Sequence, residues 1–191
     1  MPPLQVVWFK RDLRTVDHAP LYEASQRGQV APLYIFEPEL WRQPDASNRQ
    51  WRFARECLQE LDRALRRLAR RPSGLILHTG DAVEVLEQIH QTHGIAALWA
   101  HQEVGNDWTF QRDRAVRRWA RERGVPFHDI PQDGVIRGLQ SREGWRDHWD
   151  AAMRRPLVPE PPALQIAPLP SDPLPESVGD DACPLAQRGG R

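Results

Sequence analysis

At 191 residues the chain is long enough for one domain of ordinary size, and 40% of its residues are hydrophobic, enough to form a core. Its 26 Lys and Arg residues balance 26 Asp and Glu residues, which argues against a protein that coats DNA through bulk positive charge. The sequence shows no signal peptide and no apolar run of about 20 residues, the length that spans a bilayer. A cytoplasmic protein without membrane contact is therefore expected.

Short apolar runs alternate with longer amphipathic stretches from residue 4 to residue 130. The runs predicted as strands are 4–9, 30–36, 75–78, 95–100 and 125–130, and the stretches predicted as helices are 18–27, 48–71, 82–93 and 108–123. Asp17 and Asp81 precede two of these helices as candidate N-caps. The alternation predicts an α/β fold with a doubly wound, Rossmann-like, five-stranded parallel sheet covered by helices on both faces.

The end of the chain has a different composition. A further short helix is expected within residues 141–153, where Trp145 and Trp149 occur. Nine of the 18 prolines fall in residues 156–191, and apolar periodicity disappears there. The sequence therefore predicts a domain over residues 1–155 and a Pro-rich linker or disordered tail over residues 156–191.

Ligands of open parallel sheets bind beyond the C-terminal ends of the strands, so the loops after the strands are the expected site. No G-x-G-x-x-G and no P-loop follows the first strand, which disfavours a dinucleotide dehydrogenase or an NTPase. The two cysteines, Cys57 and Cys183, have no metal-site or disulfide spacing, and Cys57 is predicted to be a core thiol. The seven histidines show no metal-site spacing either.

The loop after the first strand carries the most specific motif. The run Trp8-Phe9-Lys10-Arg11-Asp12-Leu13-Arg14, followed by Asp17-His18 and Pro20-Leu21, closely resembles the opening motif of the photolyase/cryptochrome family. His18 stands where that family usually has Asn. The strand at 30–36, the helix that begins near Trp51 and the Gly80-Asp81 turn resemble the same family in order, so that the resemblance covers residues 4–155.

The resemblance implies the N-terminal, antenna-type half of a flavoprotein that repairs DNA with blue light (deoxyribodipyrimidine photo-lyase) or senses light. The helical half, which in this family binds FAD and contacts DNA, is longer than this whole chain, so we expect it to be absent and FAD not to bind here. The chain alone is then expected to be inactive as an enzyme, and DNA contact or docking is expected only through a helical FAD domain.

The resemblance also suggests an antenna pocket. Relatives with deazaflavin-type antennas line it at positions that match Asp12, Phe36, Arg52 and Glu103. Folate-binding relatives use an Asn-acidic pair, which Asn106 and Asp107 match only after a gap. Structural roles remain open beside these: an ion pair that fixes the loop for Asp12, and capping of the following helix for Glu103 and Asp107.

Two other classes of function remain open. One is a stand-alone small-ligand or nucleotide-binding module of the same fold, and the other is a docking domain with an exposed apolar patch around Trp145 or Trp149. Six arginines mark the helix at 108–123. We expect them to be spread around the helix, with Asp113 and Glu122 among them, so the sequence favours a solvated face with local ion pairs.

Overall fold

The computed structural model describes residues 2–179 and 187–190, and Cys183 lies outside them. Its elements are β1 (Leu4–Phe9), α1 (Ala19–Ser25), β2 (Gln29–Phe36), α2 (Pro38–Trp41), α3 (Asn48–Ala69), β3 (Ile76–Thr79), α4 (Ala82–His93), β4 (Ile95–His101), α5 (Asp107–Glu122), β5 (Phe127–Ile130) and α6 (Trp145–Met153). All five predicted strands are present, displaced by at most two residues at either end. The short helix α2 was not predicted.

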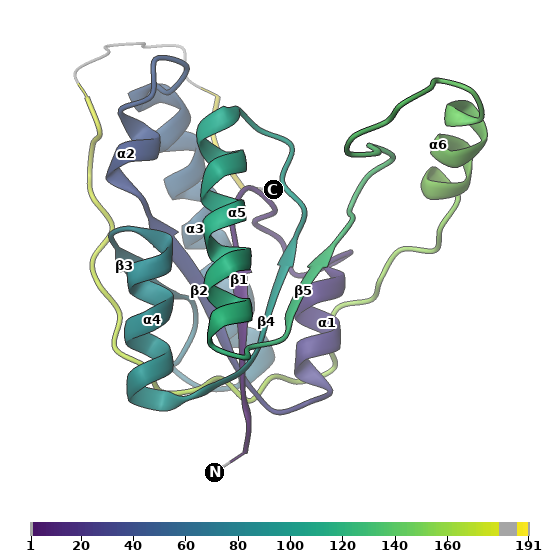
Figure 1. The fold of residues 1–191 in the computed structure, drawn as a ribbon. Helices are drawn as coiled ribbons and strands as arrows, with labels where there is room; N and C mark the ends of the chain where they lie inside the picture. The colour runs from purple at the N-terminus through teal and green to yellow at the C-terminus, as the bar shows by residue number, and fades with distance from the viewer. Residues whose placement is uncertain (1, 180–186, 191) are drawn as a thin grey trace.

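The strands form one sheet in the order β3-β2-β1-β4-β5, and every pair is parallel. The chain winds outward from β1 in one direction to β3 and then crosses back to β4 and β5. This order confirms the predicted doubly wound α/β fold (Figure 1). The switch point, where such sheets bind ligands, lies between β1 and β4.

Two apolar clusters hold helices to the two faces of the sheet. Alternate residues of β1 enter them: Val6 and Trp8 join the cluster with α4 and α5, whereas Val7 and Phe9 join the cluster with α1 and α3. Both faces of a central parallel strand are buried, which explains why β1 is apolar on both faces instead of alternating. Its one polar residue, Gln5, is buried and accepts a hydrogen bond from the Trp99 indole N–H.

Polar side chains fix where the helices begin. Asp81 accepts hydrogen bonds from Val83 and Glu84 at the start of α4, as predicted. The prediction for α1 was wrong by one residue, because His18 caps it by accepting a hydrogen bond from the Leu21 backbone N–H. Imidazole can take this place because its unprotonated nitrogen is a hydrogen-bond acceptor.

The Pro-rich segment after residue 155 packs against the domain over its described part. Leu164, Ile166 and Ala167 are buried, and Ile166 forms a parallel bridge with Val30 of β2. Farther along, Asp172 and Ser171 accept hydrogen bonds from the outer edge of β3. The boundary at residue 155 therefore does not separate the fold from a free tail, since this segment covers the edge of the sheet.

The helix α6 stands apart from the rest of the molecule (Figure 1). None of its residues is buried, and Trp145, Trp149 and Met153 are each more than 40% exposed. Among the described residues, no helix has both the length and the apolar character needed to cross a membrane.

Candidate functional site

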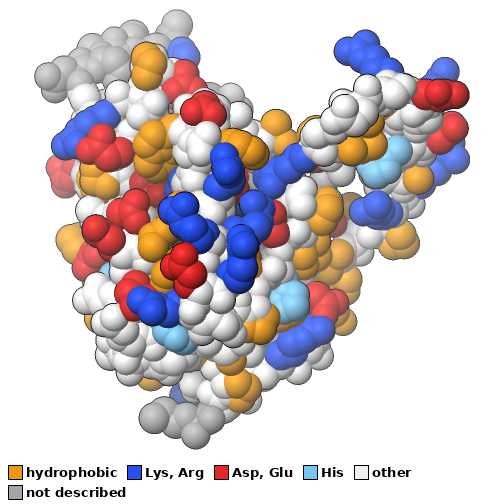
Figure 2. All heavy atoms as spheres, viewed as in Figure 1, with side chains coloured by type: hydrophobic (Ala, Val, Ile, Leu, Met, Phe, Trp, Pro, Cys, Tyr) orange, Lys and Arg blue, Asp and Glu red, His pale blue; other side chains and the backbone are white. Residues whose placement is uncertain are grey.

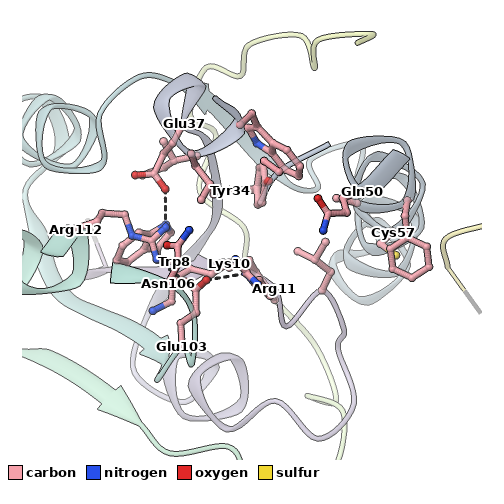
Figure 3. A pocket seen from close by; sticks show the side chains of 18 of the residues that line it. Trp8, Lys10, Arg11, Tyr34, Glu37, Gln50, Cys57, Glu103, Asn106 and Arg112 are labelled. Carbon is pink, nitrogen blue, oxygen red and sulfur yellow. Dashed lines mark hydrogen bonds and ion pairs between the residues drawn. The ribbon is translucent and has the colours of Figure 1, made fainter. Parts of the chain in front are cut away.

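A pocket of about 550 Å³ opens at the C-terminal ends of β1 and β2. Four segments line it: the end of β1 with its loop, the end of β2 with α2 and the loop after it, the N-terminal half of α3, and the loop between β4 and α5 together with Arg112 of α5. Figure 3 shows Glu37 and Arg112 on one side of this pocket and Gln50 and Cys57 of α3 on the other. The volume is in the range of small-molecule and cofactor sites.

The charged wall of the pocket is built around Arg112 of α5. Its guanidinium donates to Glu37 Oε2 at 2.7 Å, to Asp113 Oδ1 at 2.9 Å and to Glu103. All four side chains are almost fully buried, with at most 5% of each exposed. A buried cation that contacts three carboxylates is geometrically fixed, because loss of any contact would leave a charge unpaired.

Two basic residues of the first loop complete this network. Lys10 Nζ lies 3.0 Å from Asp113 Oδ2, and Arg11 Nε lies 2.8 Å from Glu103 Oε1. Lys10 is 3% exposed and Arg11 is 58% exposed at the side chain. Arg11 is therefore a cation at the mouth of the pocket that a ligand can reach.

Burial and charge shift the titration of this wall. Burial raises the pKa of Glu37 to about 7, although Arg112 opposes the shift. Burial alone would lower the pKa of Arg112, but the nearby carboxylates of Glu37, Glu103 and Asp113 outweigh it and raise that pKa. Burial and then the charge of Glu37 raise the pKa of the Tyr34 phenol, which stays protonated and can donate a hydrogen bond.

An aromatic wall faces the first loop. Trp41 of α2 lies nearly parallel to Phe36, with an angle of 8° between rings, and meets Trp51 edge-on at 5.0 Å. Glu37 Oε1 and Trp41 Nε1 are buried and have no hydrogen-bond partner within the described part of the chain. Buried polar atoms without partners are uncommon in folded proteins, and here one acceptor and one donor belong to residues that line the same pocket.

Asp12 lies behind the pocket in a cluster with two histidines. Its Oδ2 lies 2.8 Å from His18 Nε2 and 2.7 Å from His101 Nδ1, and its Oδ1 accepts the Lys10 backbone N–H. Burial would raise the pKa of Asp12, but hydrogen bonds from His101 and His18 hold it well below its usual value. These contacts join the first loop to α1 and the end of β4.

The same three side chains have a spacing that a metal ion would accept. The cap of α1 argues against that use. His18 Nδ1 accepts the Leu21 N–H, so in the neutral ring the proton is on Nε2, which then donates to Asp12 and has no lone pair for a metal. We therefore assign the cluster to hydrogen bonding.

The six predicted site residues divide into two groups. Glu103 and Asn106 line the pocket, whereas Asp12, Phe36, Arg52 and Asp107 do not. Phe36 supports the aromatic wall from behind, and Asp107 begins α5 beside a shallower hollow. Asn106 caps α5 by accepting the Thr109 N–H, the role that we had considered for its neighbours.

Most residues that line the pocket, among them Arg11, Tyr34 and Glu37, are absent from the predicted set. Three others show why. Arg112 had been counted among the surface arginines of its helix, Trp41 lies in a helix that was not predicted, and Cys57 is half-buried at the pocket and not in the core. One signal was available for Arg112. At 100° per residue it lies about 120° from the nearest exposed arginine of α5, and Val116 is four residues farther on the same face.

The fold and the pocket together define a doubly wound α/β domain with a pocket beside its switch point. The model of the DNA photolyase family matches residues 5–138, which is more than half of the chain. The chain belongs to the DNA photolyase family, and it corresponds to the N-terminal α/β domain of photolyases and cryptochromes, as the opening motif predicted.

Individual relatives agree with this assignment. The chain is 28% identical over 191 residues to an uncharacterized 31.6 kDa protein of Synechococcus sp., covering 92% of this chain and 65% of that protein. It is 30% identical over 110 residues to cryptochrome DASH of Synechocystis sp., covering 54% of this chain and 22% of that protein. A cryptochrome structure from Synechocystis superposes with a TM-score of 0.80 at 20% identity, covering all of this chain and 44% of that one.

Proposed function

We propose that the pocket binds a planar light-harvesting chromophore of the deazaflavin or flavin type. Its four lining segments are those that the family resemblance predicts for such antennas: the first loop, the end of the second strand, the long helix and the loop after the fourth strand. The observation that carries the proposal is a pocket of cofactor size in which Glu37 and Trp41 have buried polar atoms that find no hydrogen-bond partner among the described residues.

The two walls suit such a ligand. The indole of Trp41 offers a flat apolar surface against which a fused ring system can pack. Tyr34, Glu37 and Arg11 provide a donor, an acceptor and an accessible cation for the polar edge and any anionic tail of the ligand. Directional contacts of this kind fix the orientation of a chromophore, on which energy transfer depends.

A folate antenna is less well supported. The folate interpretation rests on Asn106, and its side chain is already engaged at both ends. Its oxygen accepts the Thr109 N–H, and its nitrogen donates to the Asp45 carboxylate at 3.0 and 3.1 Å. A folate would have to displace these contacts.

Family membership supports a proposal for the role of this domain in a larger protein. The chain spans 65% of the first relative and about a fifth of the cryptochromes that it matches, so the activity of a whole photolyase or cryptochrome enters here as a proposal. We propose that this domain supplies excitation energy to a flavin held by a helical domain, in DNA repair or in photoreception. No residue described here is assigned to that flavin or to a DNA lesion.

The test is an absorption spectrum of protein purified in dim light, followed by titration with a deazaflavin and, separately, with FMN and a folate. Trp41→Ala should weaken binding of the deazaflavin or FMN at least tenfold, since the ring loses its packing surface. Trp145→Ala removes the same side chain from α6, outside the pocket, and should leave binding unchanged. A protein that binds none of the three, or a Trp41→Ala variant that binds as well as the parent, would contradict the proposal.

A second candidate function is docking of a helical flavin domain, and the exposed face of α6 favours it. Trp145, Trp149 and Met153 recur every four residues and are 41%, 42% and 49% exposed. Large side chains aligned in this way are typical of a surface that a partner covers. In calorimetric titrations with a separately expressed helical domain of a family member, Trp149→Ser should weaken association at least tenfold, and no association of the parent chain would refute the idea.

A further inference from the structure

The exposed side of α5 carries a strip of arginines that lies outside the pocket. At 100° per residue, Phe110, Arg114, Arg117, Arg118 and Arg121 lie within an arc of about 100° around the helix. The interpretation of six arginines spread around the helix was therefore wrong for four of them. The other two have separate roles: Arg112 is buried in the pocket wall, and Arg123 pairs with Glu87 of α4.

Carboxylates neutralise little of this strip. Among the described residues, no ion pair is found for Arg114, Arg118 or Arg121, and all three are exposed. Arg117 shares the single carboxylate of Asp129 with Arg137, at 2.7 and 3.4 Å. Some surface arginines elsewhere have carboxylates of their own, such as Arg27 with Glu23 and Arg66 with Asp62.

The resulting patch is visible on the molecular surface. Figure 2 shows Lys and Arg side chains gathered over α5 in the middle of the face that carries α4 and α5. Five arginines around one carboxylate give a local excess of about four positive charges, although the whole chain has a net charge of zero. Asp107 and Glu122 bound the strip at the two ends of α5.

We infer that this strip, the α5 strip, is a contact surface for the phosphate backbone of a nucleic acid. From Phe110 to Arg121 it is about 16 Å long at 1.5 Å per residue, which lets its guanidinium groups reach several successive phosphates. Guanidinium is the side chain best suited to phosphate, because it donates several hydrogen bonds in a plane and stays charged. Phe110, 51% exposed and 5.8 Å from the Arg114 guanidinium, offers a ring at one end for an unpaired base.

This surface is independent of the pocket. It does not depend on the proposed antenna function, and it differs from the expectation that DNA contact requires a helical FAD domain. The arginines of the strip lie on a convex helix surface, where they are expected to contact phosphates and not the edges of bases. The affinity should therefore be independent of the DNA sequence and strongly dependent on salt. The strip would hold DNA near the domain without selecting a site.

The experiment measures fluorescence anisotropy of a labelled 20-bp duplex of mixed sequence, and of one of its single strands, with the full chain at 25 to 200 mM salt. Binding should weaken with a slope of about −3 to −4 in log K against log salt on the duplex, as expected for about four neutralised phosphates. The triple variant Arg114→Gln, Arg118→Gln, Arg121→Gln should lose at least tenfold in affinity at 50 mM salt and lower the slope to about −1.

A matched variant removes the same charge elsewhere. Arg63→Gln, Arg71→Gln, Arg155→Gln alters three exposed arginines for which the described residues show no ion pair, none of them on α5. It should bind like the parent chain. The inference fails if the parent chain binds neither form of DNA at 50 mM salt, or if the two triple variants weaken binding equally. It also fails if the parent chain binds polyglutamate as tightly as it binds DNA. Thermal melts of both variants establish that they are folded.

Discussion

Removal of the Asp12 carboxylate should lower the unfolding free energy of this domain strongly, and this effect should exceed any effect on ligand affinity. Asp12 is 4% exposed and accepts three hydrogen bonds, from the Lys10 backbone N–H and from the rings of His18 and His101, at 2.7 to 2.9 Å. Asp12→Ala leaves three buried donors without an acceptor. Breaking a buried charged contact in this way costs about 3–5 kcal/mol of unfolding free energy.

That loss is large compared with the total stability of a domain, which is about 5–15 kcal/mol. For a chain of this size it corresponds to a melting temperature lowered by roughly 6–20 °C. Urea titration followed by tryptophan fluorescence measures the change, because Trp8 and Trp51 are buried in the two cores and report on unfolding.

Asp107→Ala is the matched control. Asp107 is an exposed carboxylate at the start of α5 whose described contact is the Gln111 amide at 3.3 Å, and its loss should cost less than about 1 kcal/mol. The reasoning is refuted if Asp12→Ala costs less than 1 kcal/mol. It is also refuted if the variant keeps full stability but loses the chromophore, which is the result expected of a direct ligand contact.

Three further predictions concern titration and packing. The pKa of Glu37 is about 7 in the fold and lower when unfolded, so its contribution to the unfolding free energy should fall as pH rises from 4.5 to 7; in urea titrations the difference between the parent chain and Glu37→Gln should change in that direction. Burial lowers the pKa of His18, so its contribution has the opposite sign and should fall as pH drops below 6.5. His18→Asn, with the residue usual in the family, should remove this second contribution, and a pH profile identical to that of the parent chain would contradict it. Ile166→Ala should cost about 2–4 kcal/mol in unfolding free energy because the side chain is 7% exposed, whereas Leu157→Ala, 72% exposed, should cost less than about 0.5 kcal/mol, and equal costs would mean that the Pro-rich segment does not pack.

The alternation of apolar runs with amphipathic stretches was sufficient to predict the sheet and its covering helices. A strand buried on both faces is mostly apolar, and a covering helix is apolar on one side, so these patterns are local and can be read in order. The opening motif from Trp8 to Arg14 was specific enough to indicate the family, and the family model confirms it.

The Pro-rich segment shows where local reasoning stopped. Its prolines disfavour a helix, and its described residues form none, but prolines do not prevent an extended chain from covering an apolar edge. Leu164 and Ile166 alternate as in a strand, and whether such a pair is buried depends on an uncovered partner, here Val30 of β2, more than 130 residues earlier.

The site depended most on tertiary structure. Sequence reasoning pointed to the loops after the strands, and of its six candidate residues Glu103 and Asn106 line the pocket. It could not distinguish Asp12, which faces two histidines, from a ligand contact, nor Arg112 from the surface arginines of the same helix. A motif fixes which side chains lie near an edge of the sheet, but burial, pairing and pKa depend on the segments that pack against them, and only the folded chain brings those together.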